Sequence, residues 1–219
     1  MTVNPARARL LRDLQAELEA IYRVEAQADV AQFVIDRARW EKLSGTGASE
    51  ELVVVQGDDD LQVGLFLDDD VYAALDGAGG WTHRKLNAYL QALEGVSHFV
   101  YLTHRARVPR PVSRLELELQ AEIDKFVLML LHLGDAARRH GARALRRTLF
   151  EDVSFRQGLP PDADERYRKA NALASFYCRC LEAKYVVKSS IEGLLADLRR
   201  MYRLGAGEKL SYAACGAAI

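Results

Sequence analysis

Apolar and polar positions alternate with two different periods along this chain. From residue 11 to residue 22 apolar side chains recur every three or four positions, which predicts an amphipathic helix that Asn4 can cap. In "ELVVVQ" (51–56) and "LQVGLFL" (61–67) the period changes to two, the period of a strand. The short polar stretch 57–60 between them predicts a turn, and the two strands therefore predict a β-hairpin. Its uniformly apolar face must be covered by helices.

The second half of the chain follows the helical period almost throughout. Ser113 and Glu116 have the spacing of a capping box, and an apolar stripe then runs to about residue 130. "GLPPDAD", from Gly158, interrupts the helical pattern with two prolines. Two further helical stripes follow, up to Gly205. This half therefore predicts a helical hairpin or bundle.

One stretch, "VSHFVYLTHRARV", supports two interpretations. Its β-branched and aromatic residues favour a third strand over about 96–106, after a helix that ends at Gly95. The same stretch could also continue that helix. If it is a strand, His98 and His104 lie on one side of it, although a third metal ligand is missing nearby.

These elements together predict a helix-rich α+β fold. A small antiparallel sheet, with the hairpin at about 51–67 and a third strand at about 96–106, packs on helices and is followed by the helical hairpin or bundle. Residues 1–157 form the α+β core, and 158–206 form long helices that pack on it as a subdomain. Residues 207–219 are expected to be a flexible tail.

Composition narrows the classes of protein to which the chain can belong. Its 219 residues, 49% of them hydrophobic, carry a formal net charge of −1, which argues against a surface that binds polyanions everywhere. No apolar run reaches transmembrane length, and the first residues have no signal-peptide core, so we expect a soluble cytoplasmic protein without membrane partners. The three cysteines fit no zinc pattern, and no nucleotide-binding motif occurs, so we expect no cofactor.

Carboxylates cluster in two places, and each cluster could either bind a metal or have a purely structural role. Asp58, Asp59 and Asp60 follow Gly57 between apolar strands, as metal-binding aspartates do in palm-type polymerases, but the earlier strand with a further aspartate is missing. The favoured interpretation is a turn at 58–60 and a helix cap at 68–70. Glu118 and Glu122 are one helical turn apart, with Glu116 and Asp124 nearby, and are interpreted as a solvated helix face. A metal site at Asp58–Asp60 or at Glu118 and Glu122 is the less favoured alternative.

Arginines form a stronger signal, because they gather in two stretches. The candidate anion-binding or partner-binding residues are Arg105, Arg107, Arg110, Arg138, Arg139, Arg143, Arg146 and Arg147. Residues 50–76, by contrast, hold nine acids and no lysine or arginine. Three explanations stay open: salt bridges within one molecule, docking to a partner or a second copy, and a phosphate or nucleic-acid groove. The last is the weakest, because few aromatic residues lie among the arginines.

The function favoured by these patterns is that of a non-enzymatic interaction or regulatory protein. Its charged helical faces would bind a protein partner or a second copy of the chain. The alternative is an enzyme or binding protein for a phosphorylated or otherwise anionic ligand or for nucleic acid. In that case the arginines would hold the anion and the carboxylates a divalent metal.

Overall fold

The structure is a computed structural model that describes residues 4–56, 61–76, 79–106, 111–153 and 158–215. Its contacts divide the chain into two compact units. The N-terminal unit consists of residues 1–19 and 25–104, and the C-terminal unit of residues 20–24 and 105–219. Helix α1, Pro5–Tyr22, supplies residues to both units, because the chain passes from one to the other within it.

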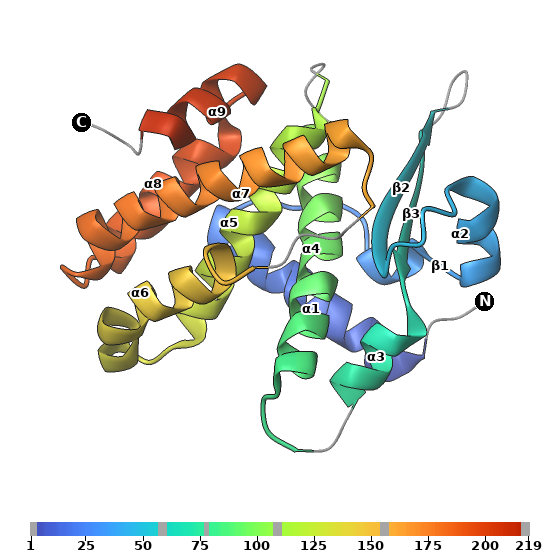
Figure 1. The fold of residues 1–219 in the computed structure, drawn as a ribbon, viewed down its shortest axis with the longest axis horizontal. Helices are drawn as coiled ribbons and strands as arrows, with labels where there is room; N and C mark the ends of the chain where they lie inside the picture. The colour runs from blue at the N-terminus through green and yellow to red at the C-terminus, as the bar shows by residue number, and fades with distance from the viewer. Residues whose placement is uncertain (1–3, 57–60, 77–78, 107–110, 154–157, 216–219) are drawn as a thin grey trace. The chain divides into compact units, whose positions relative to one another are not determined.

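The N-terminal unit contains a three-stranded sheet with the order β1-β3-β2 (Figure 1). Strands β2, Glu50–Gln56, and β3, Leu61–Leu67, form the antiparallel hairpin that the sequence predicts. Strand β1, Val34–Ile35, adds to the other side of β3 in the parallel direction. The helix-rich α+β class is therefore confirmed, with a mixed sheet in place of a purely antiparallel one.

Short elements around the sheet complete this unit. Between α1 and β2 the chain forms η1, Val30–Gln32, then β1, and then α2, Arg37–Leu43. Asp36 caps α2 by accepting a hydrogen bond from the Arg39 amide at 2.8 Å. The ring of Trp40 stacks on Phe66 of β3, with centroids 4.2 Å apart, and so fixes α2 on one face of the sheet. Helix α3, Asp69–Asp76, follows β3 directly.

Helix α4, His83–Arg105, includes the segment that the sequence favoured as a third strand at about 96–106, and that prediction is wrong. Val96, Phe99 and Val100 are all 0% exposed, and their spacing buries one face of a helix. Burial of that face outweighs the β propensity of the same residues, because propensity is a weak preference that packing overrides.

Gly95 lies inside α4 and does not end it. A Cβ atom on this residue would stand 2.6 Å from Leu65 Cδ1 and 2.9 Å from Glu50 Oε1. Glycine is therefore required here so that the sheet can approach the helix backbone closely. The glycine that suggested a helix end from the sequence is a packing residue.

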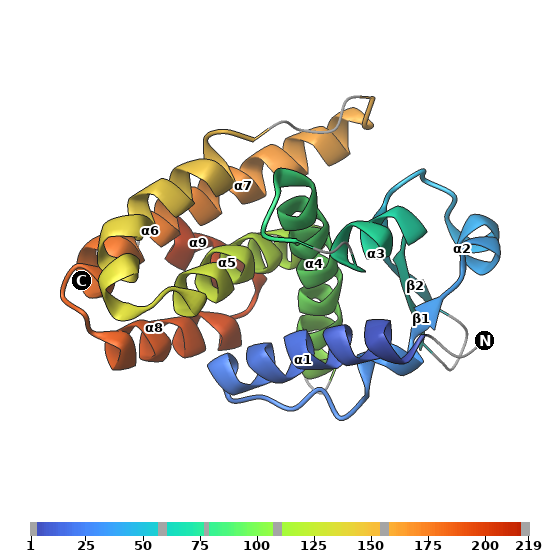
Figure 2. The same cartoon turned by 90° about the horizontal axis from the view of Figure 1, so that it is seen from below.

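The C-terminal unit is a helical bundle, as the sequence predicts. Its elements are α5, Arg114–His132; α6, Asp135–Phe150; α7, Pro161–Leu181; the π-helical turn η2, Glu182–Val186; α8, Ile191–Arg203; and α9, Ala206–Cys215. Helices α5, α6 and α7 lie side by side in both views (Figures 1 and 2). The predicted capping box is present at the start of α5, where Ser113 and Glu116 exchange hydrogen bonds.

Helix α9 occupies the segment for which the sequence predicted a flexible tail. Lys209 is 0% exposed and Ala213 is also buried, because α9 packs on α5, α7 and α8. The pattern "EKLSYAAC" concealed this packing, since one of its buried positions is a lysine. No helix among the described residues is long and apolar enough to cross a membrane.

Candidate functional site

The arginines of α6 fall into an internal set and an exposed set. Arg138 donates to the backbone oxygens of Leu130, at 3.1 Å, and Leu133, at 2.9 Å, and so closes the C-terminal end of α5. Arg146 is buried, with Nη1 2.7 Å from Glu151 and Nε 3.2 Å from Glu182. Both residues were candidates for partner binding, but both guanidinium groups are engaged within the bundle.

The remaining three residues, Arg139, Arg143 and Arg147, form what we call the arginine edge. All three are exposed and follow each other at four-residue steps along α6. Arg147 lies 3.6 Å from Glu151, an exposed pair at the C-terminal end of α6. Arg139 and Arg143 form no hydrogen bond or ion pair with any residue that the structure describes. The arginine edge therefore keeps most of its donors available.

The second arginine stretch contributes little to a shared site. Arg105, at the end of α4, is buried and has Nη1 3.4 Å from the backbone oxygen of Arg203. Arg107 and Arg110 lie outside the described residues. Arg105 is therefore an internal residue of the C-terminal unit and is not part of the arginine edge.

The candidate metal carboxylates on α5 are paired with basic side chains. Glu118 lies 3.6 Å from Arg166 Nε of α7, and Glu122 accepts a hydrogen bond from Lys125 at 2.8 Å. Glu116, Glu118 and Asp124 are all buried, so the interpretation of this face as solvated is wrong. Helix α5 packs on α6, α7 and α9, and its polar side chains that are buried need hydrogen-bond partners in the interior. The other candidates, Asp58, Asp59 and Asp60, lie outside the described residues.

The acidic stretch 50–76 finds basic and polar partners elsewhere in the N-terminal unit. Asp69 lies 2.8 Å from Arg7, and Asp68 forms an ion pair with Arg37. As the sequence predicts, Asp68 also caps α3, accepting a hydrogen bond from the Asp70 amide at 3.0 Å. Glu51 accepts hydrogen bonds from Trp40, Ser44 and Thr46, at 2.6 to 2.8 Å. The charge separation seen along the sequence is therefore partly neutralised in space.

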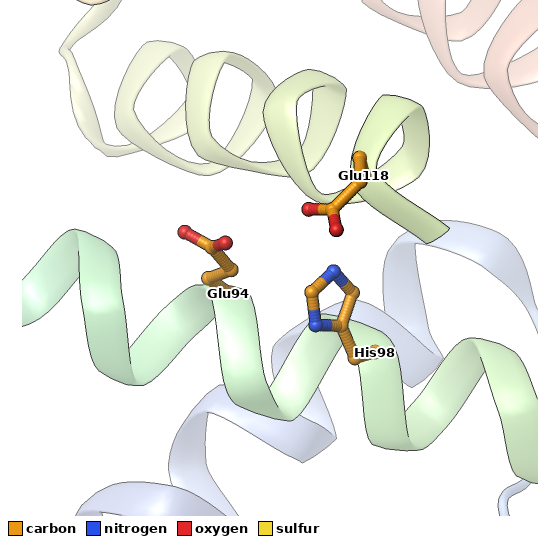
Figure 3. Close-up of side chains that lie close together, drawn as sticks. All are labelled: Glu94, His98 and Glu118. Carbon is orange, nitrogen blue, oxygen red and sulfur yellow. The ribbon is translucent and has the colours of Figure 1, made fainter. Parts of the chain in front are cut away.

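Two polar side chains of α4, Glu94 and His98, are one helical turn apart, and Figure 3 shows them on the same side of that helix. His98 is buried, and its Nδ1 lies 3.9 Å from Glu50 Oε1 of β2. Glu118, which Figure 3 also draws, belongs to α5 of the C-terminal unit. His98 and His104 were interpreted as sharing one side of a strand. On a helix, six residues turn about 240°, so they do not share a face.

A buried polar network that the sequence analysis did not identify lies in the C-terminal unit. Tyr22, at the end of α1, donates its hydroxyl hydrogen to Asp124 of α5. Gln120, one turn earlier on α5, donates to Asp124 at 2.7 Å and to the Tyr22 hydroxyl at 3.0 Å. Burial and the Asp124 carboxylate hold the pKa of Tyr22 well above its usual value. The ring of Tyr22 also stacks on Tyr202, with centroids 4.0 Å apart.

Lys209 of α9 lies in the same interior. Burial lowers its pKa to about 7, although the carboxylates of Glu116 and Asp124 act in the opposite direction. Its ammonium nitrogen lies 5.3 Å from the centre of the Tyr202 ring, the geometry of a cation–π contact. The C-terminal unit therefore buries a basic group and two carboxylates among aromatic side chains.

A second network is centred on Asp197 of α8. Its carboxylate accepts hydrogen bonds from Tyr177 of α7 at 2.7 Å, Tyr185 of η2 at 2.8 Å and Tyr212 of α9 at 3.1 Å. Burial, and then Asp197 itself, raise the pKa of Tyr177 well above its usual value. These groups hold the helices together, and the aspartate is an acceptor for three hydroxyls. Tyr177 and Tyr185 fall on the helical stripe that follows "GLPPDAD", whereas Tyr212 lies in the segment predicted to be a flexible tail, and their shared partner is visible only in space.

No protein-family model matches the chain, and no curated protein or solved structure matches it either.

Proposed function

We propose that this chain is a non-enzymatic interaction or regulatory protein, and that its arginine edge binds an acidic surface of a protein partner. The observation that supports this most directly is the division of the α6 arginines. Arg138 and Arg146 are engaged inside the bundle, whereas Arg139 and Arg143 are exposed and have no partner among the described residues.

The spacing of the arginine edge suits a row of carboxylates. Four residues of helix advance about 6 Å, so Arg139, Arg143 and Arg147 place three guanidinium groups along roughly 12 Å. Each guanidinium can bind a carboxylate through two parallel hydrogen bonds. Arginine is also enriched in protein–protein interfaces, unlike lysine. A helix or strand with acids on one face would match this row.

A separate partner is favoured over a second copy of the chain. Self-association through opposite charges would need the acidic stretch 50–76 to be available. Within that stretch Asp68, Asp69 and Glu51 already hold partners in the N-terminal unit. These three carboxylates would have to leave those partners before they could bind arginines of another copy.

Nucleic acid is a weaker candidate than an acidic protein. Single strands are usually held by aromatic side chains placed among the basic ones. The only phenylalanine, tyrosine or tryptophan of α6 is Phe150, which is buried. The metal-assisted alternative also has less support, because Glu118 and Glu122 are paired with Arg166 and Lys125.

Charge reversal of the arginine edge tests the proposal. The full-length chain, the triple variant Arg139→Glu, Arg143→Glu, Arg147→Glu and a matched control are used as baits in cell extract. The bound proteins are then quantified by mass spectrometry. The control carries the same change of charge at three exposed arginines on other helices: Arg39→Glu, Arg84→Glu and Arg114→Glu.

We expect at least one partner with an acidic surface that both the unchanged chain and the control retain and that the triple variant loses by about tenfold or more. Circular dichroism checks that all three proteins are equally folded. An identical set of bound proteins for the triple variant would contradict the proposal. Loss in the control as well would mean that net charge, rather than the arginine edge, determines binding.

A further inference from the structure

A small pocket of about 140 Å³ lies in the N-terminal unit, where three helices begin. Arg7 comes from the first turn of α1, Arg37 is the first residue of α2, and Asp69 is the first residue of α3. Its apolar lining includes Ile35 of β1 and Phe66 of β3. Helix starts carry partial positive charge, so the pocket combines two guanidinium groups with the positive ends of α1 and α3. Two carboxylates also line it: Asp36, which caps α2, and Asp69.

The two arginines differ in how firmly their carboxylate partners are held. Asp68, the partner of Arg37, also caps α3 through the Asp70 amide, and this hydrogen bond is the main cause that lowers the pKa of Asp68. Asp69, the partner of Arg7 at 2.8 Å, has a side chain that is 85% exposed. An exposed ion pair contributes little to stability. Asp69 can therefore leave Arg7 at small cost, whereas Asp68 cannot leave its place as easily.

Two polar atoms beside this pocket are buried and have no hydrogen-bond partner among the described residues. They are the hydroxyl of Tyr72, whose residue is 3% exposed and lines the pocket, and Nε of Arg7. The Arg7 guanidinium lies over the Tyr72 ring, 4.2 Å from its centre. Burial raises the pKa of Tyr72 to about 12 against the effect of Arg7, so at neutral pH the hydroxyl keeps its hydrogen. Because buried polar atoms are nearly always paired, two unpaired donors together indicate a missing acceptor.

The apolar lining restricts what kind of acceptor fits. Ile35 and Phe66 are almost fully buried and give the pocket a hydrophobic floor. A cavity of about 150 Å³ lined by such side chains holds a molecule of the size of benzene. The pocket therefore suits a ligand of a few heavy atoms, with an anionic end for the arginines and an apolar end for the floor. A carboxylate with a short hydrocarbon group has this combination, and inorganic phosphate does not.

We propose that this pocket binds a small carboxylic acid, whose carboxylate replaces that of Asp69 on Arg7 and accepts hydrogen bonds from Arg7 and Tyr72. The hydrocarbon part of the ligand packs on Phe66 and Ile35. Asp69 then competes with the ligand, since its own carboxylate pairs with Arg7 when no ligand is bound. The inference is independent of the arginine edge, because it uses residues of the N-terminal unit only.

The test is a titration of the full-length chain with butyrate, followed by NMR of labelled phenylalanine and tyrosine rings. Butanol, which is neutral, and inorganic phosphate, which lacks the apolar group, serve as comparison ligands. The variants are Arg7→Gln, Tyr72→Phe and Asp69→Asn. Asp13→Asn is the matched control, because Asp13 forms an exposed pair with Arg9 on the same helix, at 3.8 Å.

We expect saturable shifts of the Phe66 and Tyr72 signals with butyrate, at a dissociation constant of about 1 mM or below. Arg7→Gln should weaken binding by about tenfold or more, and Tyr72→Phe by about threefold to tenfold. Asp69→Asn should tighten binding by about threefold or more, because it removes the competing carboxylate. Asp13→Asn should change nothing.

The result for Asp69→Asn is decisive even if Arg7→Gln affects folding. Unchanged or weaker butyrate binding by Asp69→Asn would overturn the proposal, as would the absence of saturable shifts with butyrate. Equal binding of butanol would show that the arginines take no part, which overturns it as well. Equal binding of phosphate, with no dependence on the apolar floor, would replace the carboxylic acid with a simple anion and would also overturn it.

Discussion

Tyr177 and Asp197 are joined by a hydrogen bond of 2.7 Å between side chains of α7 and α8. The carboxylate is buried and receives two further tyrosine hydroxyls, so one side chain connects α7, α8, α9 and the π-helical turn between them. In the low dielectric of an interior, such shared acceptors are stronger than isolated hydrogen bonds.

Asp197→Ala is therefore expected to destabilise the protein strongly. It removes the acceptor of three hydroxyls and leaves that of Tyr177 buried without a partner, at a cost of about 3 kcal/mol. Tyr212→Phe, which removes the longest of the three bonds, should cost less than about 1 kcal/mol. Urea unfolding followed by circular dichroism measures both variants. Equal losses of stability would show that the shared carboxylate is not the source of the effect.

Stability should depend on pH through Lys209. The pKa of Lys209 is about 7 in the folded protein, against 10.5 for an unperturbed lysine, so the unfolded chain binds more protons between these values. The free energy of unfolding should then rise with pH across this window, by on the order of 1 kcal/mol per pH unit for this group alone. Below about pH 7 the contribution is constant.

Lys209→Met separates this effect from other titrating groups. The variant should lose the rise seen between about pH 7 and pH 10, while its packing against Tyr202 is largely kept. Urea midpoints measured at several pH values in this window provide the comparison. The same slope in both proteins would mean that Lys209 is not the group responsible.

Gly95→Ala is expected to destabilise the N-terminal unit although alanine is the better helix former. The added Cβ would meet Leu65 Cδ1 at 2.6 Å, and relieving that overlap costs about 1 to 3 kcal/mol. Gly141→Ala in α6 is the matched control, because its Cβ would meet only Leu133 Cδ1, at 3.5 Å. There the helix preference should prevail, with a gain of up to about 1 kcal/mol. Thermal unfolding should show shifts of opposite sign.

The division of the α6 arginines into an internal and an exposed set can be tested by comparing the stability of single variants. Arg146→Ala should cost about 3 kcal/mol, because it removes a buried guanidinium and leaves the carboxylate of Glu182, only 18% exposed, without its partner. Arg143→Ala, at an exposed position of the same helix, should change stability by no more than about 0.5 kcal/mol. Denaturant titration of the two variants decides this, and a large cost at Arg143 would place it in the internal set.

Local sequence patterns were sufficient to predict the features that are formed by residues close together in the sequence. The capping box of Ser113 and Glu116, the cap formed by Asp68 and the hairpin all involve residues a few positions apart, so the sequence specifies them. Strand β1 could not be predicted in this way. It is two residues long, and it is a strand only because β3 pairs with it from 31 positions further along the chain, as Val34 and Leu65 show.

Buried charge was the main feature that pattern analysis missed. Asp124 and Lys209 both looked like surface residues, because charged side chains are seldom fully buried. Asp124 accepts from Gln120 nearby on α5, but its other partner, Tyr22, is 102 positions away, so no window of sequence contains both ends of that bond. Among the arginines, the residue type alone could not separate Arg146 from Arg143, since their difference lies in whether an acidic partner is in reach.

The end of helix α1 affects both how the chain folds during synthesis and how it can be truncated. Residues 20–24 belong with the C-terminal unit, where Arg199 donates to the Ile21 backbone oxygen at 2.8 Å and Arg203 to that of Tyr22 at 3.0 Å. During synthesis on the ribosome these residues emerge early, but their partners Arg199 and Arg203 are added only when nearly the whole chain has been made. A single cut near residue 104 would also leave them on the wrong fragment. We therefore expect that no single truncation separates the two units, and co-expressed fragments would have to reassemble around residues 20–24.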